Sequence, residues 1–457
     1  MFKAIAQTFA NCFRIPELKS RIVFTLLMLG VCRLLAWIPV PGLDASELNK
    51  YFAANASKMQ DSLLGMYSLF TGGALQNCAV GALGIMPYIT ATIIVQLLSA
   101  VVPQLSKMVR EEGGRAKIVQ IGRCLTIVLC LGHGTLMTLG WEHPQTLFPS
   151  FVGNLVTVEN LWWYRIQTVL ILTTGTVVLM WLGEQITERG IGNGISLVIT
   201  IGIIADLPGA AHGIYLMFFP KEGSRVHLFG AIGLVLLLLT VVALVISVTQ
   251  AQRKIPVQYA QRAVGRKVYA GQTSYMPLRV NYAGVMPIIF AQAILMFPQQ
   301  IFTWLGQLLN SDFIRGIGIQ LSYGHATYYL FYGLMIMFFS YFWVATQFNE
   351  IQIADDLKKH GGYIPGVRPG QATSNYLHHS MTRITLAGAI FLTLIAVVPM
   401  FLGEAFNIDR RVGRFFGGTS ILITVGVLLD TMRQMESHLL MRHYDGFLKK
   451  GRLRGRF

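Results

Sequence analysis

The stretch that decides the fold runs from residue 61 to residue 103 and reads DSLLGMYSLFTGGALQNCAVGALGIMPYITATIIVQLLSAVVP. Residues 62–70 form a short amphipathic segment, too brief to cross a bilayer core of about 30 Å. Thr71-Gly72-Gly73 interrupts that segment, and residues 78–102 then form an apolar run that is long enough to span. The run carries helix-weakening and polar residues, namely Gly81, Gly84, Pro87, Thr90, Thr92 and Gln96. Since non-helical backbone at membrane depth must be covered by protein or water, this stretch predicts a stopper and one wall of a pore.

The composition is that of a multi-pass membrane protein. Mean hydropathy is +0.54 and only 13% of the 457 residues are charged, which favours a single membrane domain over several soluble ones. Residues 1–20 lack an apolar core with a small-residue cleavage site, so we expect no cleavable signal peptide. The five cysteines are odd in number and none lies at CxxC spacing, so neither a disulfide framework nor a metal site is indicated.

Ten apolar runs are long enough to span a membrane. They cover residues 21–40, 78–102, 118–140, 164–184, 192–211, 228–250, 281–305, 325–347, 382–402 and 415–436. With the N-terminus placed in the cytoplasm, roughly three quarters of the 37 basic residues fall on the cytoplasmic side, which puts both termini there by the positive-inside rule. The net charge of +16 therefore reports orientation and contact with anionic lipid, and we expect no binding to DNA.

The even number of runs predicts an all-α multi-pass membrane protein, with ten transmembrane helices in two pseudo-symmetric five-helix halves around a central pore. We expect the first half at residues 21–211 and the second at residues 212–436. A cytosolic N-terminal segment (1–20) and a basic cytosolic tail (437–457) flank them. The two halves share no visible sequence repeat, so the symmetry is an expectation from the topology.

Two cytosolic loops are longer than a helix connection needs, and long loops in compact domains are usually functional or disordered. The first, at about residues 251–280, holds six basic residues and no acid, and its side chains alternate as in a β-hairpin. The second, at about residues 349–382, contains GGYIPGVRPG at residues 361–370. Two prolines and four glycines there predict a stiff, sharply bent tip that presents Arg368.

No enzyme constellation is found in the sequence. The glycine-rich residues 183–194 lack the GxxxxGK[ST] pattern that cradles phosphate, and they follow a membrane helix rather than a strand. His378 and His379 are adjacent, so they cannot share one helical face as metal ligands. Few ionisable residues lie within the runs, whereas an ion-coupled transporter needs acids at mid-membrane; they are Arg33, His133, Glu184, Asp206 and Asp430. We therefore expect no cofactor.

Isoleucine recurs at mid-membrane positions, in two cases as pairs four residues apart that share one helical face. The positions are Ile85 and Ile89, Ile195 and Ile199, Ile289, and Ile423. Spacing alone favours a core or lipid-facing place for these side chains over a functional one.

Five strings resemble the SecY/Sec61-alpha family, whose members are the channel-forming subunits of protein translocases. They are GALGIMPYI (81–89), MWLGEQITERGIGNGIS (180–196), GRKVY (265–269), PGVRPG (365–370) and FGGTS (416–420). They occur in the family's order, within a resemblance that extends from about residue 15 to residue 450. The resemblance implies a passive protein-conducting channel subunit of the bacterial inner (plasma) membrane, not an enzyme. Unfolded secretory proteins would pass through it, and signal or transmembrane segments would leave it sideways into lipid.

The same resemblance assigns site residues. The six isoleucines fall on the family's pore-ring positions, where branched apolar side chains form a constriction that dewets and blocks ions. The family's plug, a short helix that seats below the ring, corresponds to Ser62, Leu63, Leu64, Gly65, Met66, Tyr67, Ser68, Leu69, Phe70, Thr71, Gly72 and Gly73. A lateral gate between the second and seventh helices would be hydrated by Thr90, Gln96 and Gln292, although packing between helices explains these polar residues equally well.

The cytosolic loops carry the contacts with partners that the resemblance implies. Arg262, Arg266, Lys267 and Arg368 match positions that bind the SecA motor ATPase or the ribosome. Without the resemblance, basic residues beside a membrane are read as orientation signals and lipid contacts. Gln261 departs from the bacterial pattern, which often has lysine there. The other implied partners are SecE-like and SecG-like small membrane subunits, signal peptides and nascent chains.

Without the resemblance, the residues leave two other classes of protein as alternatives. A secondary transporter for a small solute fits ten helices and a broken second helix, but it predicts a polar site at the midplane. An integral-membrane enzyme needs a cluster of His, Asp or Glu near one face.

Overall fold

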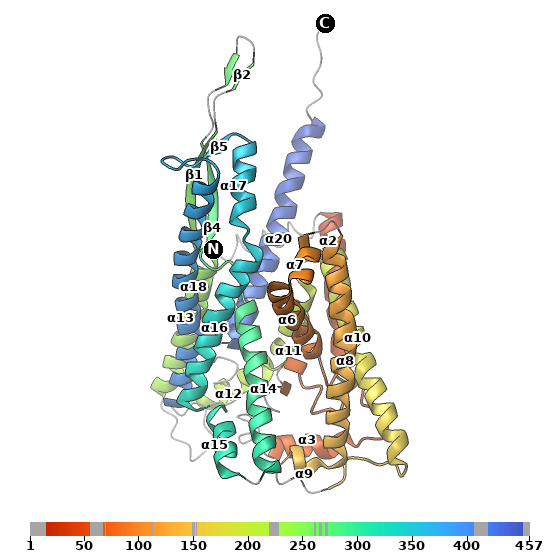
Figure 1. Ribbon diagram of the computed structural model, residues 1–457. Coiled ribbons are helices and arrows are strands. Elements are labelled where there is room, and N and C mark those ends of the chain that lie inside the picture. The colour runs from red at the N-terminus through yellow and green to blue at the C-terminus, as the bar shows by residue number, and fades with distance from the viewer. Residues whose placement is uncertain are drawn as a thin grey trace. The chain divides into compact units, whose positions relative to one another are not determined.

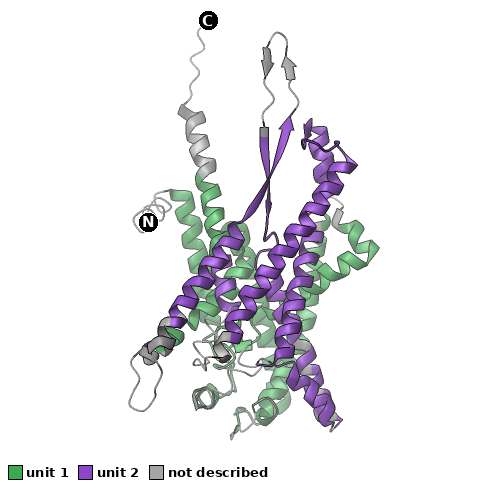
Figure 2. Ribbon diagram, turned by 90° about the vertical axis from the view of Figure 1, so that its left-hand side faces the viewer, with its two compact units in different colours: residues 1–213, 427–457 green, residues 214–426 purple. Residues whose placement is uncertain are grey.

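The computed structural model describes residues 15–54, 67–68, 70–110, 113–148, 151, 153–218, 228–259, 262–264, 267–269, 273–309, 311–322, 324–405 and 419–450. The chain forms two compact units, one of residues 1–213 and 427–457 and the other of residues 214–426 (Figure 2). Residues 427–436, expected in the second half, thus belong to the first unit. The side chain of Gln434 accepts a hydrogen bond of 2.8 Å from the amide of Gly192, and Met435 and Leu439 pack against Leu18 and Ile191.

The first unit is a bundle of helices (Figure 1). Its helices are α2 (Pro16–Leu35), α3 (Ala45–Ala54), α6 (Met86–Val101), α7 (Pro103–Arg110), α8 (Gly114–Glu142), α9 (Pro144–Leu147), α10 (Leu161–Arg189), α11 (Gly194–Ala205) and most of α20 (Thr419–Lys450), and α12 (Leu207–Phe218) leads into the second unit. Proline in the first turn starts α2 and α6, while the side chains of Asn160 and Asn193 cap α10 and α11. Helix α8 packs against α6 and α10, and α10 packs against α2 and α11.

An aromatic core holds α3 and α9 against the rest of the first unit. Its fully buried members include Trp141 and Phe148, and Tyr51 meets the rings of Phe148 and Phe151 edge-on. Leu75, Cys78, Ala82 and Leu83 belong to the same core. The segment that precedes α6 is therefore fixed in apolar packing on one side.

The run at residues 78–102 was expected to form a spanning helix weakened by glycine and proline, and its helix begins only at Met86. Residues 72–85 form turns, and Gly84 has a φ of +57°, a left-handed conformation that favours glycine. The backbone of this segment bonds to the chain that follows α2, with Val80 N donating to Ile38 O at 2.9 Å and Gly81 N to Leu35 O at 3.0 Å. The 16 residues of α6 extend about 24 Å, less than the thickness of a bilayer core.

The second unit combines membrane-type helices with a small sheet. Its elements are α13 (Leu228–Gln250), β1 (Gln252–Tyr259), β2 (Arg262–Val264), β3 (Lys267–Tyr269), β4 (Thr273–Arg279), α14 (Met286–Leu308), α15 (Asp312–Gln320), α16 (Ala326–Gln347), α17 (Glu350–Lys359), β5 (Gly362–Tyr363) and α18 (Gln371–Ala405). Helix α14 packs against α15 and α16, while α18 packs against α13, α16 and α17. The first eight residues of α20 also belong to this unit.

The strands confirm the hairpin expected at residues 251–280. Strand β1 pairs antiparallel with β4 over a register from Gln252–Arg279 to Gln258–Thr273, and β2 pairs with β3 further out. Strand β5 from the second loop adds to the other edge of β1, giving the order β4-β1-β5. The chain is therefore mostly helical, and the strand that was not expected from the sequence is β5 in the second loop.

Each of the ten apolar runs overlaps one helix, from α2 for the first run to α20 for the last. Within the described residues, five helices are long and apolar enough to cross a membrane: Ala116–Glu142, Leu161–Arg189, Gly194–His212, Ala326–Lys359 and Gln371–Phe401. Shorter apolar helices lie at Met86–Val101, Val235–Gln250 and Met286–Leu295. Together they make the protein a multi-pass membrane protein by composition and length.

Gly175 lets α10 approach the segment before α6, because a β-carbon at this position would collide with the backbone carbonyl of Val80. We expect Gly175→Ala to destabilise the purified protein by roughly 1–3 kcal/mol, since backbone must shift to admit the methyl group. Thermal unfolding in detergent measures the loss. Gly132→Ala is the matched control, because nothing lies within 4 Å of its β-carbon, and it should leave the midpoint unchanged or raise it.

Candidate functional site

The six isoleucines are all withdrawn from the surface. Ile85, Ile89, Ile199, Ile289 and Ile423 are at most 3% exposed, and Ile195 is partly buried. The first unit holds Ile85 and Ile89 at the start of α6 and Ile195 and Ile199 at the start of α11, while Ile289 (α14) and Ile423 (α20) lie in the second unit. None of the six is thus an exposed, lipid-facing side chain.

Local hydrogen bonds position the isoleucine pair of α11. The side-chain oxygen of Asn193 accepts hydrogen bonds from the amides of Ile195 and Ser196, at 3.2 and 3.3 Å. The hydroxyl of Thr187 accepts a bond of 2.9 Å from Gly194 N and donates to the carbonyl of Gly183 at 3.0 Å. The turn between α10 and α11 is therefore closed by side chains, and it sets where the first residues of α11 lie.

The predicted plug segment (residues 62–73) is described only at its C-terminal end. Ser62, Leu63, Leu64, Gly65, Met66 and Leu69 lie outside the described residues. The hydroxyl of Tyr67 donates to Leu83 O at 2.9 Å, and Gly73 N donates to Ser68 O at 3.0 Å. A β-carbon at Gly202 of α11 would lie 3.1 Å from Phe70 O, so the segment passes close to that helix.

A small cavity of about 30 Å³ lies beside the plug segment, with room for about a single water molecule. Its walls come from α2, α10, α11 and the turns before α6. They include Arg33, Phe70, Thr71, Ile85, Val198 and Gly202. One isoleucine of the predicted ring and two residues of the predicted plug thus line the same cavity within the first unit.

The predicted gate residues lie on α6 and α14. Thr90 is buried and its hydroxyl donates to the carbonyl of Met86, one turn earlier in α6, at 3.0 Å. The side-chain oxygens of Gln96 and Gln292 are buried and have no hydrogen-bond partner among the described residues. Buried carboxamides without partners are costly, so these two positions offer acceptors to an incoming polar group.

The loops that follow α13 and α16 share one hydrophobic core. Ile255 and Leu278 from the sheet pack with Phe348, Ile364 and Leu377 from the helical side. The tip at residues 361–370 bends at Gly366 (φ +81°) and Gly370 (φ +100°), and Thr373 of α18 donates to Arg368 O at 2.9 Å. The side chain of Arg368 is exposed at this anchored tip, as expected.

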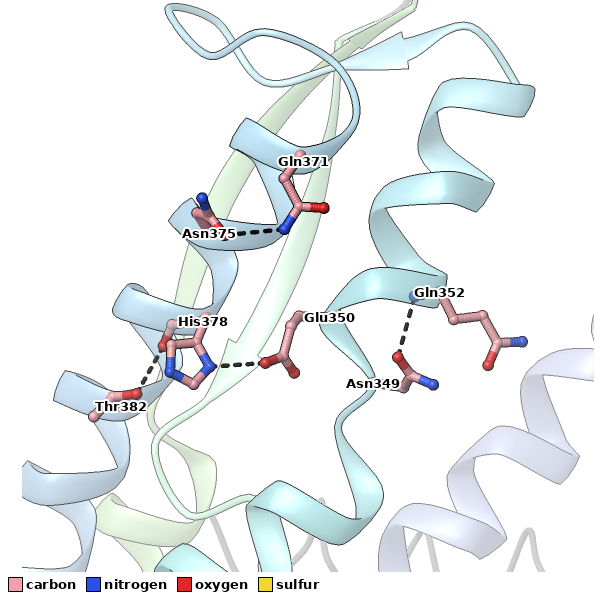
Figure 3. A network of polar contacts seen from close by, with 7 residues as sticks. All are labelled: Asn349, Glu350, Gln352, Gln371, Asn375, His378 and Thr382. Carbon is pink, nitrogen blue, oxygen red and sulfur yellow. Dashed lines mark hydrogen bonds and ion pairs between the residues drawn. The ribbon is translucent and has the colours of Figure 1, made fainter. Parts of the chain in front are cut away.

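Polar contacts tie α17 to α18 beneath that tip. Figure 3 shows His378 of α18 and Glu350 of α17 pointing toward one another, with 2.7 Å between Nδ1 and Oε1. The side chain of Asn349 caps α17 by accepting from Gln352 N at 3.2 Å. His378 thus joins two helices, and the part of the chain that the structure describes contains no group of three or more metal-ligand side chains.

The other predicted partner-contact residues lie on the outer hairpin. Arg262 is in β2 opposite Tyr269, and Lys267 is in β3 opposite Val264. Arg266, in the turn between these strands, is outside the described residues.

Arg33 was noted in the sequence without a role, and the structure gives it a partner. Its Nη1 donates to the carbonyl oxygen of Gly72 at 2.8 Å. The sequence does contain one signal for Arg33, since a charged residue inside an apolar run is by default a candidate functional position. The partner is 39 residues further along the chain, so spacing could not reveal it.

Comparisons with known proteins agree with this arrangement. The sequence model of the SecY family matches residues 79–432. The protein translocase subunits SecY of Chlamydia trachomatis (42% identity over 98% of this chain and 99% of the relative) and Vibrio cholerae (42%, 96% and 96%) are similar to it. Among solved structures, a protein-conducting channel matches with a TM-score of 0.61 at 19% identity, over 97% of this chain and 99% of the other. A ribosome-bound canine Sec61 channel matches with a TM-score of 0.56 at 18% identity, over 97% of this chain and 99% of the other.

The fold and the family match define the class, which is a protein-conducting membrane channel rather than an enzyme. The chain belongs to the SecY family. It functions as a subunit of a protein translocase, and the alternatives of a small-solute transporter and a membrane enzyme are set aside.

Loss of the α11 cap should destabilise the first turn of α11, where Ile195 lies. Asn193→Ala removes the acceptor for two amides at the start of α11, at a cost of about 1 kcal/mol, and should raise ion leak of the reconstituted complex. Asn193→Ser keeps an acceptor and should behave like the parent. Asn160→Ala, which removes the cap of α10, is the second control and should lower thermal stability without leak. Equal leak from both alanine variants would contradict a specific role for the α11 turn.

Proposed function

We propose that this chain conducts unfolded secretory proteins across the bacterial inner membrane through ten transmembrane helices, with both termini in the cytoplasm. The six isoleucines line the pore, and residues 62–73 act as its plug. The observation that carries the proposal is that Ile85, which is 3% exposed, borders the same cavity as Phe70 and Thr71 of the plug segment. A relative's structure, similar at a TM-score of 0.59, concerns a SecY plug domain that stabilises the closed channel and maintains a membrane seal.

A ring of isoleucines suits a passive conduit. Branched apolar side chains exclude water and ions from a narrow constriction when no substrate is present. They offer a passing polypeptide no strong partner, so chains of any sequence can slide between them. Because no nucleotide-binding pattern occurs in the sequence, the energy for transport has to come from a partner.

Release into lipid is the second part of the proposal. Thr90, Gln96 and Gln292 would hydrate a gate between α6 and α14, where the two glutamine oxygens lack partners in the described structure. An apolar segment of about twenty residues gains free energy on moving from the channel into lipid, and this transfer drives its exit.

The cytosolic sheet and the Arg368 tip form the docking platform for the SecA motor or the ribosome. Support comes from the shared core that anchors the tip, from its exposed arginine, and from the ribosome-bound state of the canine Sec61 relative. Arg262, Arg266 and Lys267 add positive charge on the outer hairpin. SecE-like and SecG-like subunits would complete the complex, with anionic lipid beside the basic loops.

Polar substitution in the ring tests the conduit. Ile85→Ser and Ile199→Ser should raise ion conductance of the resting reconstituted channel several-fold, because a polar constriction stays wet. Single-channel recording in a planar bilayer measures this. Ile127→Ser, at a 42% exposed position on α8, is the matched control and should stay tight. If the ring variants were as tight as the control and took up one solute saturably, the channel interpretation would be wrong.

Charge reversal tests the platform. Arg368→Glu should strongly reduce motor-driven export into vesicles, while the protein remains inserted and its thermal midpoint is unchanged, because an exposed side chain is altered. Lys19→Glu alters an exposed basic residue of α2, outside the sheet and the tip, so it serves as the control and should export normally. Normal export by the Arg368 variant would remove that residue from the contact surface, and an equal loss in both would indicate nonspecific attraction.

A further inference from the structure

A charged side chain in a membrane helix needs a partner, and Arg33 finds one in the plug segment. Arg33 lies in the last turn of α2 and is partly buried. Its guanidinium donates to Gly72 O at 2.8 Å, across 39 residues of sequence. A charged donor makes this contact stronger than an ordinary hydrogen bond to a backbone carbonyl.

Glycines lie close to this bond on two sides. A β-carbon at Gly202 would lie 3.4 Å from Gly72 N, and one at Gly84 would lie 3.0 Å from Cγ2 of Thr71. The plug segment therefore comes close to the backbone of α11, and its Phe70 and Thr71 are buried beside a small cavity. Among the described contacts of Gly72, the bond from Arg33 is the charged one.

Asp206 adds a second favourable interaction. It follows the last residue of α11 and interacts electrostatically with Arg33. The negative charge lowers the cost of keeping the guanidinium charged where it is partly buried.

We propose that Arg33 is a positioning residue that latches the C-terminal end of the plug segment, and so sets how readily the channel opens to weak signal sequences. This inference rests on the proposed role of residues 62–73 as the plug. The latch consists of the Arg33–Gly72 bond, at a place where Gly202 lets the plug segment come close to α11.

Leak and signal stringency of the intact membrane complex test the latch. Arg33→Gln should raise resting ion leak of proteoliposomes about tenfold, the shift expected when a hydrogen bond from a charged donor is lost from one of two states. It should also admit a substrate with a defective signal sequence. Arg33→Lys keeps the charge and a donor, so it should restore most of the seal. Arg165→Gln, which breaks an ion pair to Glu142 between α8 and α10, is the matched control and should stay tight.

A mutant cycle identifies the contact. A methyl group at Gly72 would press on the Arg33 guanidinium and on the backbone of Gly202, at a residue with a φ of +60°, so Gly72→Ala should leak at least as much as Arg33→Gln. If the two residues share one contact, the double variant should leak clearly less than the product of the two single effects. If the Arg33→Gln complex fails to assemble, Gly72→Ala carries the same test. A double variant that leaks as the product of the two single effects would overturn the shared contact.

A disulfide separates release of the segment from general loosening. The β-carbon positions of Thr71 and Gly84 are 3.7 Å apart, which matches disulfide geometry. Oxidising Thr71→Cys with Gly84→Cys in the Arg33→Gln background should abolish the extra leak, and reduction should restore it. Leak that persists after complete oxidation would overturn the latch.

Deletion of residues 62–70 separates this inference from the proposed function. If the deletion variant leaks ions and the Arg33→Gln variant is as tight as the parent, the proposed role of residues 62–73 as the plug is supported and the proposed latch is wrong. If the deletion itself leaves the membrane tight, both the plug and the latch are overturned.

Discussion

The structure of the first unit depends on how the backbone of residues 72–85 satisfies its polar groups. This segment is not helical, and it pairs part of its amides and carbonyls in turns of its own, such as Gln76 N to Gly73 O and Ala79 N to Ala74 O. The chain that follows α2 supplies further partners, through bonds such as Val80 N to Ile38 O and Val40 N to Cys78 O. Glycines at 81 and 175 allow the close approach that these bonds require. The short α6, the position of Ile85 and the cavity beside it all follow from this pairing.

The two units are stabilised by different means. In the first, glycine and backbone hydrogen bonds bring segments together near the isoleucines, and the aromatic core lies around α3 and α9. In the second, the loops that follow α13 and α16 build a core of their own from a sheet and two helices. This core includes Val344 of α16 and Met381 of α18, so the sheet and the tip with the exposed Arg368 are anchored on the ends of two long apolar helices.

The sequence predicted the helices well, because long apolar runs and their breaks report directly on burial in a membrane. The hairpin and the Arg368 tip were also predictable, since turn residues and strand alternation are local signals. The late start of α6 was not, because hydropathy does not distinguish an apolar helix from an apolar turn; φ of +57° at Gly84 became evident only in three dimensions. The bond from Arg33 to Gly72 and the placement of Gln434 beside Gly192 are long-range contacts, which no periodicity encodes. The six isoleucines were found by resemblance, since their spacing alone favoured ordinary packing.

The burial of residues 70–74 has a thermodynamic consequence. Phe70 and Thr71 are only 8% and 7% exposed and Ala74 is fully buried, so detaching this end of the segment uncovers an aromatic ring and other apolar area. That step accordingly carries a positive heat-capacity change, and its free energy follows a curve with temperature rather than a straight line. A membrane seal built on this packing would be tightest at an intermediate temperature and would weaken on cooling as well as on heating.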